Sequence, residues 1–431
     1  MERRPTEGWG GNQRLCLLAL VRFVKRYGSS VCPCRVRAPT LQPEPVLVLG
    51  GGLMGLAIAH QLARRGHGVR VISRNRKEAA GFVAAGMLAP HAEGLSGTLL
   101  ALGQASLARV PGWVATIEAD SGLGCGLRHC GIVVPLATAA ERDAHPTAAW
   151  GEPLDRARLE REVSGIGPRW QAGLLFAQDG QIDNRRRLMR ALERACVERG
   201  VRFEEGSTVQ TLHQNGGGEL EAITLVDAAG QTRSARCSRA VLCSGAWSAR
   251  LLPQLPIHPV KGQMLSLQGP RGALNRVIFG PGTYLVPRQD GLVVVGATSE
   301  PEAGFVEGLT PAGQRQLQAG IEALLPEAAR WPPMERWWGF RPCTPDEGPL
   351  LGPSPIPGLW LAAGHHRNGV LLAAITAELL AAAIGASLGD PGLEPANAAL
   401  LASCSWQRFA PPVSEANDLH LADAVDRVPP H

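Results

Sequence analysis

The sequence predicts a two-domain α/β protein, in which a discontinuous Rossmann-like domain carries an inserted domain of mostly antiparallel sheet. Three segments lead to this prediction. Residues 45–73 contain an apolar run, a glycine-rich turn, a helical segment and a second apolar run. Residues 259–298 contain apolar runs separated by turn residues, as in antiparallel strands. Residues 358–384 contain an apolar run, a glycine turn and a long apolar helix.

The first segment, PVLVLGGGLMGLAIAHQLARRGHGVRVIS, has the complete pattern of a β-α-β unit. Its continuous apolar run suits a strand buried on both faces of a parallel sheet. Gly50, Gly52 and Gly55 follow with G-x-G-x-x-G spacing, which permits a tight turn, close approach of a pyrophosphate and packing of the helix on the strand. Because a helix N-terminus attracts phosphate, these residues predict a dinucleotide-binding site.

The end of the second strand leaves the choice of dinucleotide open. An acidic residue is expected there to bind the adenosine ribose, but the chain has Ser73 followed by the basic run Arg74–Lys77. Read locally, serine beside arginine slightly favours a 2′-phosphate, and hence NADP, over FAD. In contrast, residues 79–94 place Gly86 and Met87 among small residues, which suits close contact with a flat ligand.

Composition argues against several other classes of protein. The formal net charge of +5 on 431 residues comes from scattered arginines and not from a basic stripe, so we predict no nucleic-acid binding. The ten cysteines include no CxxC pair, and the histidines have no zinc spacing. This predicts reduced thiols, no metal site and a cytoplasmic location. The apolar run 15–24 is interrupted by Arg22 and is too short to span a membrane. We expect residues 1–44 to be a disordered extension and residues 401–431 a loose tail.

A series of motifs follows along residues 45–400: GGGLMG, AAGMLAPHAE, CSGAWS, PVKGQMLSL, GTYLVPRQDGLVVVGAT, WWGFRPCTPDEGPLLG and GHHRNGVLLA. With these motifs the chain resembles the D-amino acid oxidase/glycine oxidase family of FAD enzymes, and within it the bacterial glycine oxidases of thiamine biosynthesis. The resemblance implies FAD as the cofactor. Some sarcosine-oxidising relatives attach their flavin to a cysteine, but Gly339 and not Cys343 stands nearest that place, so we expect non-covalent FAD.

The resemblance also implies which residues contact FAD. They belong to the glycine loop, the end of the second strand, the Gly-Met segment, a valine at the adenine and a late glycine turn around the isoalloxazine ring. The residues are Gly50, Gly52, Leu53, Met54, Gly55, Ser73, Arg74, Ala85, Gly86, Met87, Val209, His365, His366, Arg367, Asn368, Gly369, Val370 and Leu371. The family usually has Glu where Ser73 stands, so the ribose contact departs from the family pattern.

Further positions match the family's substrate-binding residues. Arg341 corresponds to the arginine that clamps the substrate carboxylate, since a guanidinium fits a carboxylate with two parallel hydrogen bonds. Tyr284 matches a tyrosine whose hydroxyl joins this clamp, and Arg367 matches a second arginine at the substrate end of the flavin. The alternatives are that the arginines brace loops and that Tyr284 is a core aromatic residue. No catalytic residue beyond the flavin is required, because the flavin performs the redox step.

The implied reaction is the oxidative deamination of glycine or a similar small amino acid, such as sarcosine or D-alanine. A hydride passes from the α-carbon to flavin N5, molecular oxygen is reduced to hydrogen peroxide, and the glycine imine supplies thiamine thiazole synthesis. The implied partners are a thiazole synthase and further copies of the chain in a homo-oligomer. Gly282 and Ser299 replace bulkier residues of close relatives, which leaves the preferred substrate open.

The family fold also implies a division into domains. The FAD-binding domain comprises residues 45–121, 178–257 and 339–400, and the substrate domain comprises residues 122–177 and 258–338. Three alternatives to the oxidase remain open. They are an FAD dehydrogenase of D-amino acids that passes electrons to quinone, the oxidase-like part of a tRNA wobble-uridine modification enzyme, and a non-catalytic nucleotide-binding module.

Overall fold

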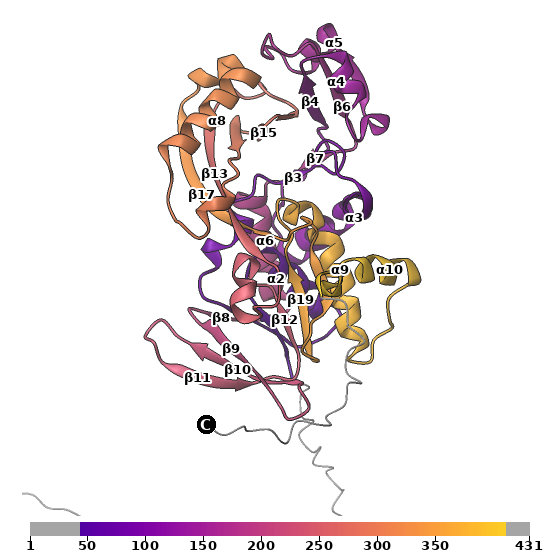
Figure 1. Cartoon of the computed structure of the whole chain (residues 1–431), viewed down its shortest axis with the longest axis vertical. Coiled ribbons are helices and arrows are strands. Elements are labelled where there is room, and N and C mark those ends of the chain that lie inside the picture. The colour runs from indigo at the N-terminus through magenta and orange to yellow at the C-terminus, as the bar shows by residue number, and fades with distance from the viewer. Residues whose placement is uncertain (1–43, 411–431) are drawn as a thin grey trace, which may run out of the picture. The chain divides into compact units, whose positions relative to one another are not determined.

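A computed structural model describes residues 44–410. Its first layer is a six-stranded sheet in the order β18-β19-β12-β1-β2-β8, parallel except where β18 pairs antiparallel with β19. Figure 1 labels β8, β12 and β19 of this sheet. The strands are β1 Val46–Leu49, β2 Val69–Ser73, β8 Arg202–Glu205, β12 Ala240–Leu242, β18 Leu350–Pro353 and β19 Leu359–Ala363. Every residue of β1 is buried, as its continuous apolar run requires.

Alternate residues of these strands pack against different layers. Val46 and Val48 of β1 belong to a core shared with helices α2 (Leu53–Arg64), α3 (Gly97–Ser121), α6 (Met189–Glu198) and α9 (Gly369–Ala386). Leu47 and Leu49 face the opposite way and pack with a three-stranded antiparallel sheet. Its strands are β9 Thr208–Gln214, β10 Leu220–Val226 and β11 Thr232–Arg236. The period of two along a strand thus places the parallel sheet between helices and a small sheet.

Helix α9 is long and apolar enough to cross a membrane by length and composition alone, but 78% of it is buried inside the fold. It packs against both α2 and α3. A helix that is apolar on every side is stable in water only when neighbours cover it. Helix α9 is therefore a core helix of this domain.

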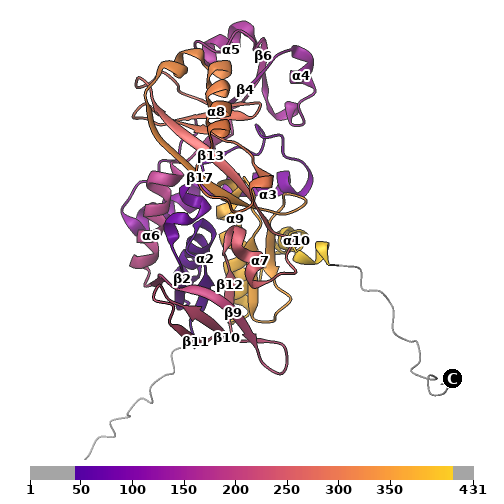
Figure 2. The same cartoon turned by 60° about the vertical axis from the view of Figure 1, so that its left-hand side comes forward.

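The second layer is an eight-stranded sheet in the order β17-β13-β16-β15-β14-β4-β6-β5. Its pairs are antiparallel except for β14 with β4. The strands are β4 Ile132–Leu136, β5 Glu152–Asp155, β6 Ala172–Phe176, β13 His258–Gln268, β14 Val277–Gly280, β15 Thr283–Pro287, β16 Leu292–Gly296 and β17 Pro333–Cys343. Helices α5 (Arg156–Glu162) and α8 (Pro311–Leu324) pack on one face, and residues 85–92 contact the other. Figure 2 shows β13 and β17 running from α8 toward α9.

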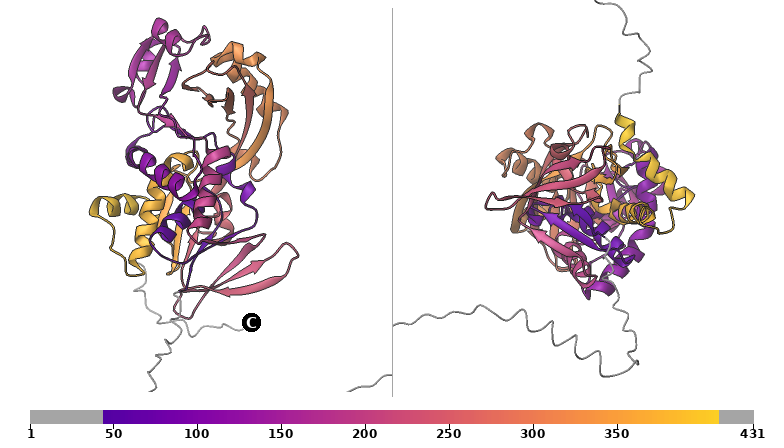
Figure 3. Two further views of the ribbon diagram at one scale, coloured as in Figure 1. Left: turned by 180° about the vertical axis from the view of Figure 1, so that it is seen from behind. Right: turned by 90° about the horizontal axis from the view of Figure 1, so that it is seen from below.

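Short elements complete the described chain. Strand β3 (Met87–Leu88) pairs with β7 (Gly180–Gln181), and a π-helical turn, η4 (Asn184–Leu188), precedes α6. The other helices are α4 Ala139–Asp143, α7 Ser248–Leu251 and α10 Pro395–Ser403. The 3₁₀ turns are η1 Arg76–Glu78, η2 Ala80–Phe82, η3 Ala148–Trp150, η5 Gly245–Trp247, η6 Pro301–Ala303, η7 Pro326–Arg330 and η8 Trp406–Phe409. Figure 3 shows β9–β11 at the end of the molecule opposite α4 and α5.

Two expectations about the chain's ends have different outcomes. Residues 1–43 lie outside the described residues. Of the tail expected at residues 401–431, residues 411–431 also lie outside the described residues. Residues 401–410 are not loose: α10 continues to Ser403, and the Arg408 guanidinium lies 2.7 Å from the Asp346 carboxylate. The ion pair and the packing of Leu401 in the core fix this segment on the domain. The domain division stays a proposal, and its boundary at residue 339 falls within strand β17.

Candidate active site

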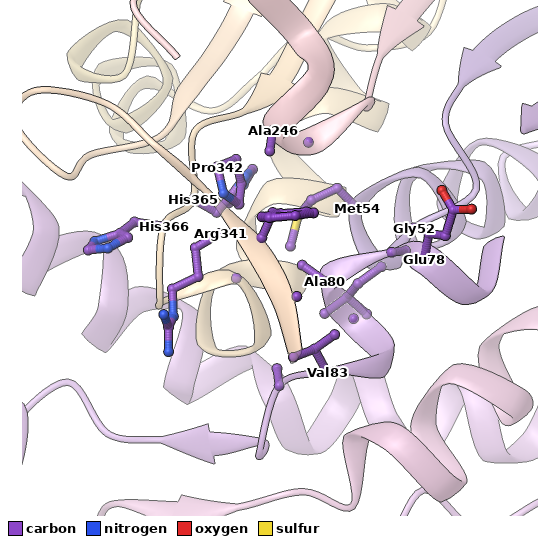
Figure 4. Close-up of a pocket in the computed structure, with 18 of the residues that line it drawn as sticks. Gly52, Met54, Glu78, Ala80, Val83, Ala246, Arg341, Pro342, His365 and His366 are labelled. Atoms are coloured by element: carbon purple, nitrogen blue, oxygen red, sulfur yellow. The ribbon is translucent and has the colours of Figure 1, made fainter. Parts of the chain in front are cut away.

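A cavity of about 650 Å³ lies between the two large sheets. The six-stranded sheet contributes the loop after β1 and the end of β2, and the eight-stranded sheet contributes residues of β13, β15 and β17. The N-termini of α2 and α9 both open on it. Figure 4 shows Gly52 and Glu78 at one end of the pocket and Arg341 and His366 at the other, with Met54 between them.

The glycine loop has the geometry that its spacing predicts. Gly50 has φ +124°, and a Cβ there would lie 2.4 Å from the carbonyl oxygen of Cys243. Gly52 is the N-cap of α2, whose first turn contains no acidic side chain. Gly55 does not line the cavity, because its Cα packs on the loop itself: a Cβ would lie 1.9 Å from the Gly50 carbonyl oxygen. The loop therefore presents backbone amides and a helix N-terminus, which together favour a phosphate group.

The end of β2 carries the residues expected at the ribose. Ser73 is buried there and lines the cavity, and Val209 of β9 lines it nearby. The Arg74 guanidinium pairs with the Glu78 carboxylate and lies 5.4 Å from the ring centroid of Trp247. Glu78 also lines the cavity. It is the first acidic residue after the strand, and we did not predict a role for it.

The two arginines of the basic run after Ser73 are engaged in ion pairs. Arg74 is bound by Glu78, and the Arg76 Nε lies 2.6 Å from Glu205 and its Nη1 lies 3.0 Å from Glu193. These carboxylates neutralise the charge that locally favoured a 2′-phosphate. Because Glu193 and Glu205 are far along the chain, the sequence around Ser73 gave no sign of them.

The Gly-Met segment is fixed from behind by buried polar contacts. Gly86 has φ +87°, and a Cβ there would lie 2.0 Å from the Ile182 carbonyl oxygen. The buried guanidinium of Arg288 donates a hydrogen bond of 2.5 Å to the Ala85 carbonyl. Met87 pairs with Gln181 across β3 and β7. Residues 85–87 therefore form a rigid wall of the cavity.

Arg341 and Tyr284 lie together at the end of the cavity remote from the glycine loop. The Arg341 Nη1 donates a 3.1 Å hydrogen bond to the Thr298 carbonyl. Its guanidinium lies over Gly262, where a Cβ would come within 2.4 Å of Nη1. Burial raises the pKa of Tyr284 above its usual value, although the Arg341 charge opposes this shift, so the phenol keeps its proton and can donate. A cation and a phenol side by side suit a carboxylate.

Arg367 lies between two carboxylates at the same end. Its Nε is 3.0 Å from Glu93 and its Nη2 is 4.0 Å from Glu347. The Glu93 side chain is 6% exposed and lines the cavity. Burial raises the pKa of Glu93 to about 7 although Arg367 and Arg341 oppose this shift. We did not predict Glu93; its signal is the single acid in the run AAGMLAPHAE, whose other residues except His91 are apolar or glycine.

The two histidines of the late glycine turn are uncharged. His365 is buried with Nε2 3.1 Å from the Thr376 hydroxyl, and burial lowers its pKa to about 3. Burial also lowers the pKa of His366 to about 4, against the attraction of the Glu347 charge. Its backbone has φ +44°, and its amide donates to the Pro342 carbonyl at 2.8 Å. Both residues thus shape the turn and line the cavity without adding charge.

The remaining predicted residues lie at the start of α9. Asn368, Gly369 and Val370 line the cavity. Leu371 does not: it is buried in the helical core, and its carbonyl accepts a 2.5 Å hydrogen bond from Ser106. The first turn of α9 contains no acidic side chain. The dipole of α9 therefore stabilises negative charge at the end of the cavity that its N-terminus faces.

These residues fit a long dinucleotide with a flat ring at one end. The glycine cradle has no room for a Cβ, one helix N-terminus faces each half of the cavity, and the wall at residues 85–87 brings backbone close. A model of the family described as FAD dependent oxidoreductase matches residues 45–383.

The chain belongs to this FAD-dependent oxidoreductase family. A bifunctional protein ThiO/ThiG from Synechocystis is 42% identical over 343 residues, which are 78% of this chain and 50% of that protein. A glycine oxidase from Pseudomonas aeruginosa is 30% identical over 370 residues, covering 82% of this chain and 97% of the relative. The crystal structure of glycine oxidase from Geobacillus kaustophilus has a TM-score of 0.75 at 28% identity, covering 84% of this chain and 98% of that one.

The flavoenzyme spans about half the length of the ThiO/ThiG relatives that it matches. At the level of the family, the predicted α/β fold, the FAD cofactor and the assignment to the oxidoreductases are confirmed. The residues after Ser73, read alone, slightly favoured NADP as the cofactor. That prediction is wrong, because the family is FAD-dependent.

Proposed function

We propose that this flavoenzyme oxidises glycine or a similarly small amino acid, with molecular oxygen as the acceptor and hydrogen peroxide as a product. The observation that carries the proposal is the pair Arg341 and Tyr284 at the end of the cavity remote from the glycine loop. The Arg341 guanidinium binds the substrate carboxylate, and the Tyr284 phenol donates a further hydrogen bond. Relatives named glycine oxidase support this substrate class.

FAD, when bound, supplies the two-electron oxidation of the substrate α-carbon. Among the residues that line the cavity, residues 50–54 would hold its pyrophosphate, Ser73 and Val209 would lie at the adenosine half, and residues 85–87 and 365–370 would enclose the ring. Fixing the carboxylate sets the position of the α-carbon, so proximity contributes to the rate. The two neutral histidines add no charge to this end of the cavity.

We propose that FAD is held without a covalent bond. Gly339 has no thiol, and the buried Cys343 thiol is directed to the Thr344 carbonyl at 3.4 Å. Acid precipitation should therefore release all the yellow flavin into the supernatant. Colour retained in the protein pellet would contradict this.

The cavity has room for substrates slightly larger than glycine. Gly282 has φ +68° and nothing within 4 Å of its Cβ position, and both Gly282 and Ser299 line the cavity. Small residues at these positions support activity on sarcosine and D-alanine as well. The ThiO/ThiG relatives support use of the glycine imine in thiamine thiazole synthesis, with a thiazole synthase as partner. A cytoplasmic location and a homo-oligomer stay predictions.

The test is anaerobic reduction of the purified holoenzyme. Glycine should bleach the flavin spectrum, and air should restore it with release of hydrogen peroxide. Sarcosine and D-alanine then rank the substrates by rate of bleaching. If glycine bleaches the flavin but only a quinone, and not air, restores its spectrum, the enzyme is a dehydrogenase and not an oxidase. A flavin that none of the three amino acids reduces would refute the proposed function.

A further inference from the structure

Glu93 is a buried carboxylate in the loop between β3 and α3. Its side chain is 6% exposed and lines the same cavity as Arg341 and Tyr284. Its Oε2 lies 3.0 Å from the Arg367 Nε, yet this oxygen accepts no well-directed hydrogen bond from any described residue. A buried carboxylate without such a donor retains the capacity to take a proton.

The loop that carries Glu93 is rigid. The buried Asp179 accepts hydrogen bonds from the amides of His91 at 3.2 Å and Ala92 at 2.8 Å, and it lies 2.6 Å from the His91 Nδ1. The His91 Nε2 in turn lies 3.1 Å from Gln104. The amide of Glu93 donates to the Ala89 carbonyl at 3.0 Å. The Glu93 backbone is thus fixed next to the cavity.

Two cations and two carboxylates act on the charge of Glu93, and the cations act more strongly. The cations Arg367, before α9, and Arg341, at the end of β17, favour its ionised form, whereas Asp179 and Glu347 disfavour it. Tyr284 of β15 faces it with a neutral phenol. Burial is the largest influence and raises the pKa of Glu93 to about 7.

The chemistry of the proposed reaction requires a proton acceptor. An amino acid arrives from water as a zwitterion, and its nitrogen must lose a proton before the lone pair can assist departure of the hydride. In a site with little water, an ammonium beside a carboxylate is less favourable than in solution, because burial penalises both charges. Transfer of one proton converts both groups to neutral forms.

We propose that Glu93 accepts this proton from the substrate ammonium, an inference that rests on the proposed function. One N–H bond of the ammonium breaks, and one O–H bond forms at the Glu93 carboxylate. The electron pair of the broken bond stays on nitrogen, and no electrons leave the substrate in this step. Arg341, whose charge acts on Glu93, would hold the substrate carboxylate meanwhile, and the inference places the amine end toward Glu93.

The test compares Glu93→Gln with the wild-type holoenzyme. Anaerobic flavin reduction by glycine is followed by stopped flow from about pH 6 to about pH 10. The upper limit approaches the pH at which the amine of free glycine loses its proton in solution. The wild-type rate should fall as the pH drops below about 7, because a protonated Glu93 cannot accept. The E93Q rate should be lower by about 10²-fold at neutral pH, as for loss of a general base, and should approach the wild-type rate as the pH rises.

Glu93→Asp and Glu335→Gln complete the comparison. E93D keeps a carboxylate and should restore the acidic limb of the pH profile. E335Q removes an exposed carboxylate at the far end of β17 and should give the wild-type profile. A deficit of E93Q that is equal at all pH values, or an E93Q profile that coincides with the wild type, would overturn the inference.

Acetate binding gives a readout that does not depend on turnover. Acetate has a carboxylate and no amine, so its affinity, measured from the flavin absorbance, should be unchanged or higher in E93Q. Weaker acetate binding would show that Glu93 only supports the structure of the site and would overturn the inference. If neither glycine, sarcosine nor D-alanine reduces the wild-type flavin, the proposed function fails and the inference fails with it; failure confined to the variants refutes the inference alone.

Discussion

The two ends of the cavity are built in different ways. The glycine loop comes from one continuous segment, residues 45–73, and its function depends on the absence of side chains. The opposite end, where we propose that the substrate binds (the substrate end), is assembled from β15, β17, the loop before α3 and the turn before α9, and it contains charged side chains. The first end recognises a ligand by backbone shape and the second by charge.

This difference predicts different responses to substitution. A change at the glycine loop should affect FAD binding and stability together, because the same backbone packs the domain and cradles the phosphates. A change at the substrate end should affect catalysis with little effect on the bound flavin. The variants below test this separation, beginning with the largest expected effect.

Arg341→Leu should lower kcat/KM for glycine by about 10²- to 10³-fold. A buried, charge-assisted hydrogen-bonding partner contributes about 2–5 kcal/mol when its removal leaves the other charge unpaired. The flavin spectrum and the FAD content should stay as in the wild type. Steady-state oxygen consumption and the absorbance ratio of flavin to protein measure the two effects. Loss of FAD in R341L would contradict the separation of the two ends.

Gly50→Ala should weaken FAD binding by at least about tenfold and lower the free energy of unfolding by about 1–3 kcal/mol, as for overpacking. The new Cβ would lie 2.4 Å from the Cys243 carbonyl oxygen in a backbone conformation with φ +124°. Gly66→Ala is a matched control, since Gly66 has φ +89° but nothing within 4 Å of its Cβ position. G66A should lose stability and keep its affinity for FAD; equal FAD loss in both variants would contradict the argument.

The same difference explains how far each end could be predicted from the sequence. Gly50, Gly52 and Gly55 were predictable because a local pattern determines their geometry. The motif that contains Arg341 was recognisable, but the position of Glu93 beside Arg367 was not, since the two residues are 274 positions apart and meet only through the packing of α3 and α9. The side chain of Leu371 lies in the helical core and not at the cavity, because successive residues of a helix point to different sides. The resemblance had treated the whole segment alike.

Glu78→Gln should have the smallest effect, because its carboxylate is about half exposed. Ser73 stands where an acid would bind the ribose, and Glu78 follows within the same cavity, so we propose that Glu78 supplies the missing acceptor. Loss of its charge should raise the Kd for FAD by about 3- to 10-fold, the range of one hydrogen bond to an exposed ligand group. Fluorescence titration of the apoenzyme with FAD measures this Kd, and titration with riboflavin, which lacks the adenosine, is the control. Equal weakening of both ligands would show that Glu78 acts only through the Arg74 side chain and the shape of the loop.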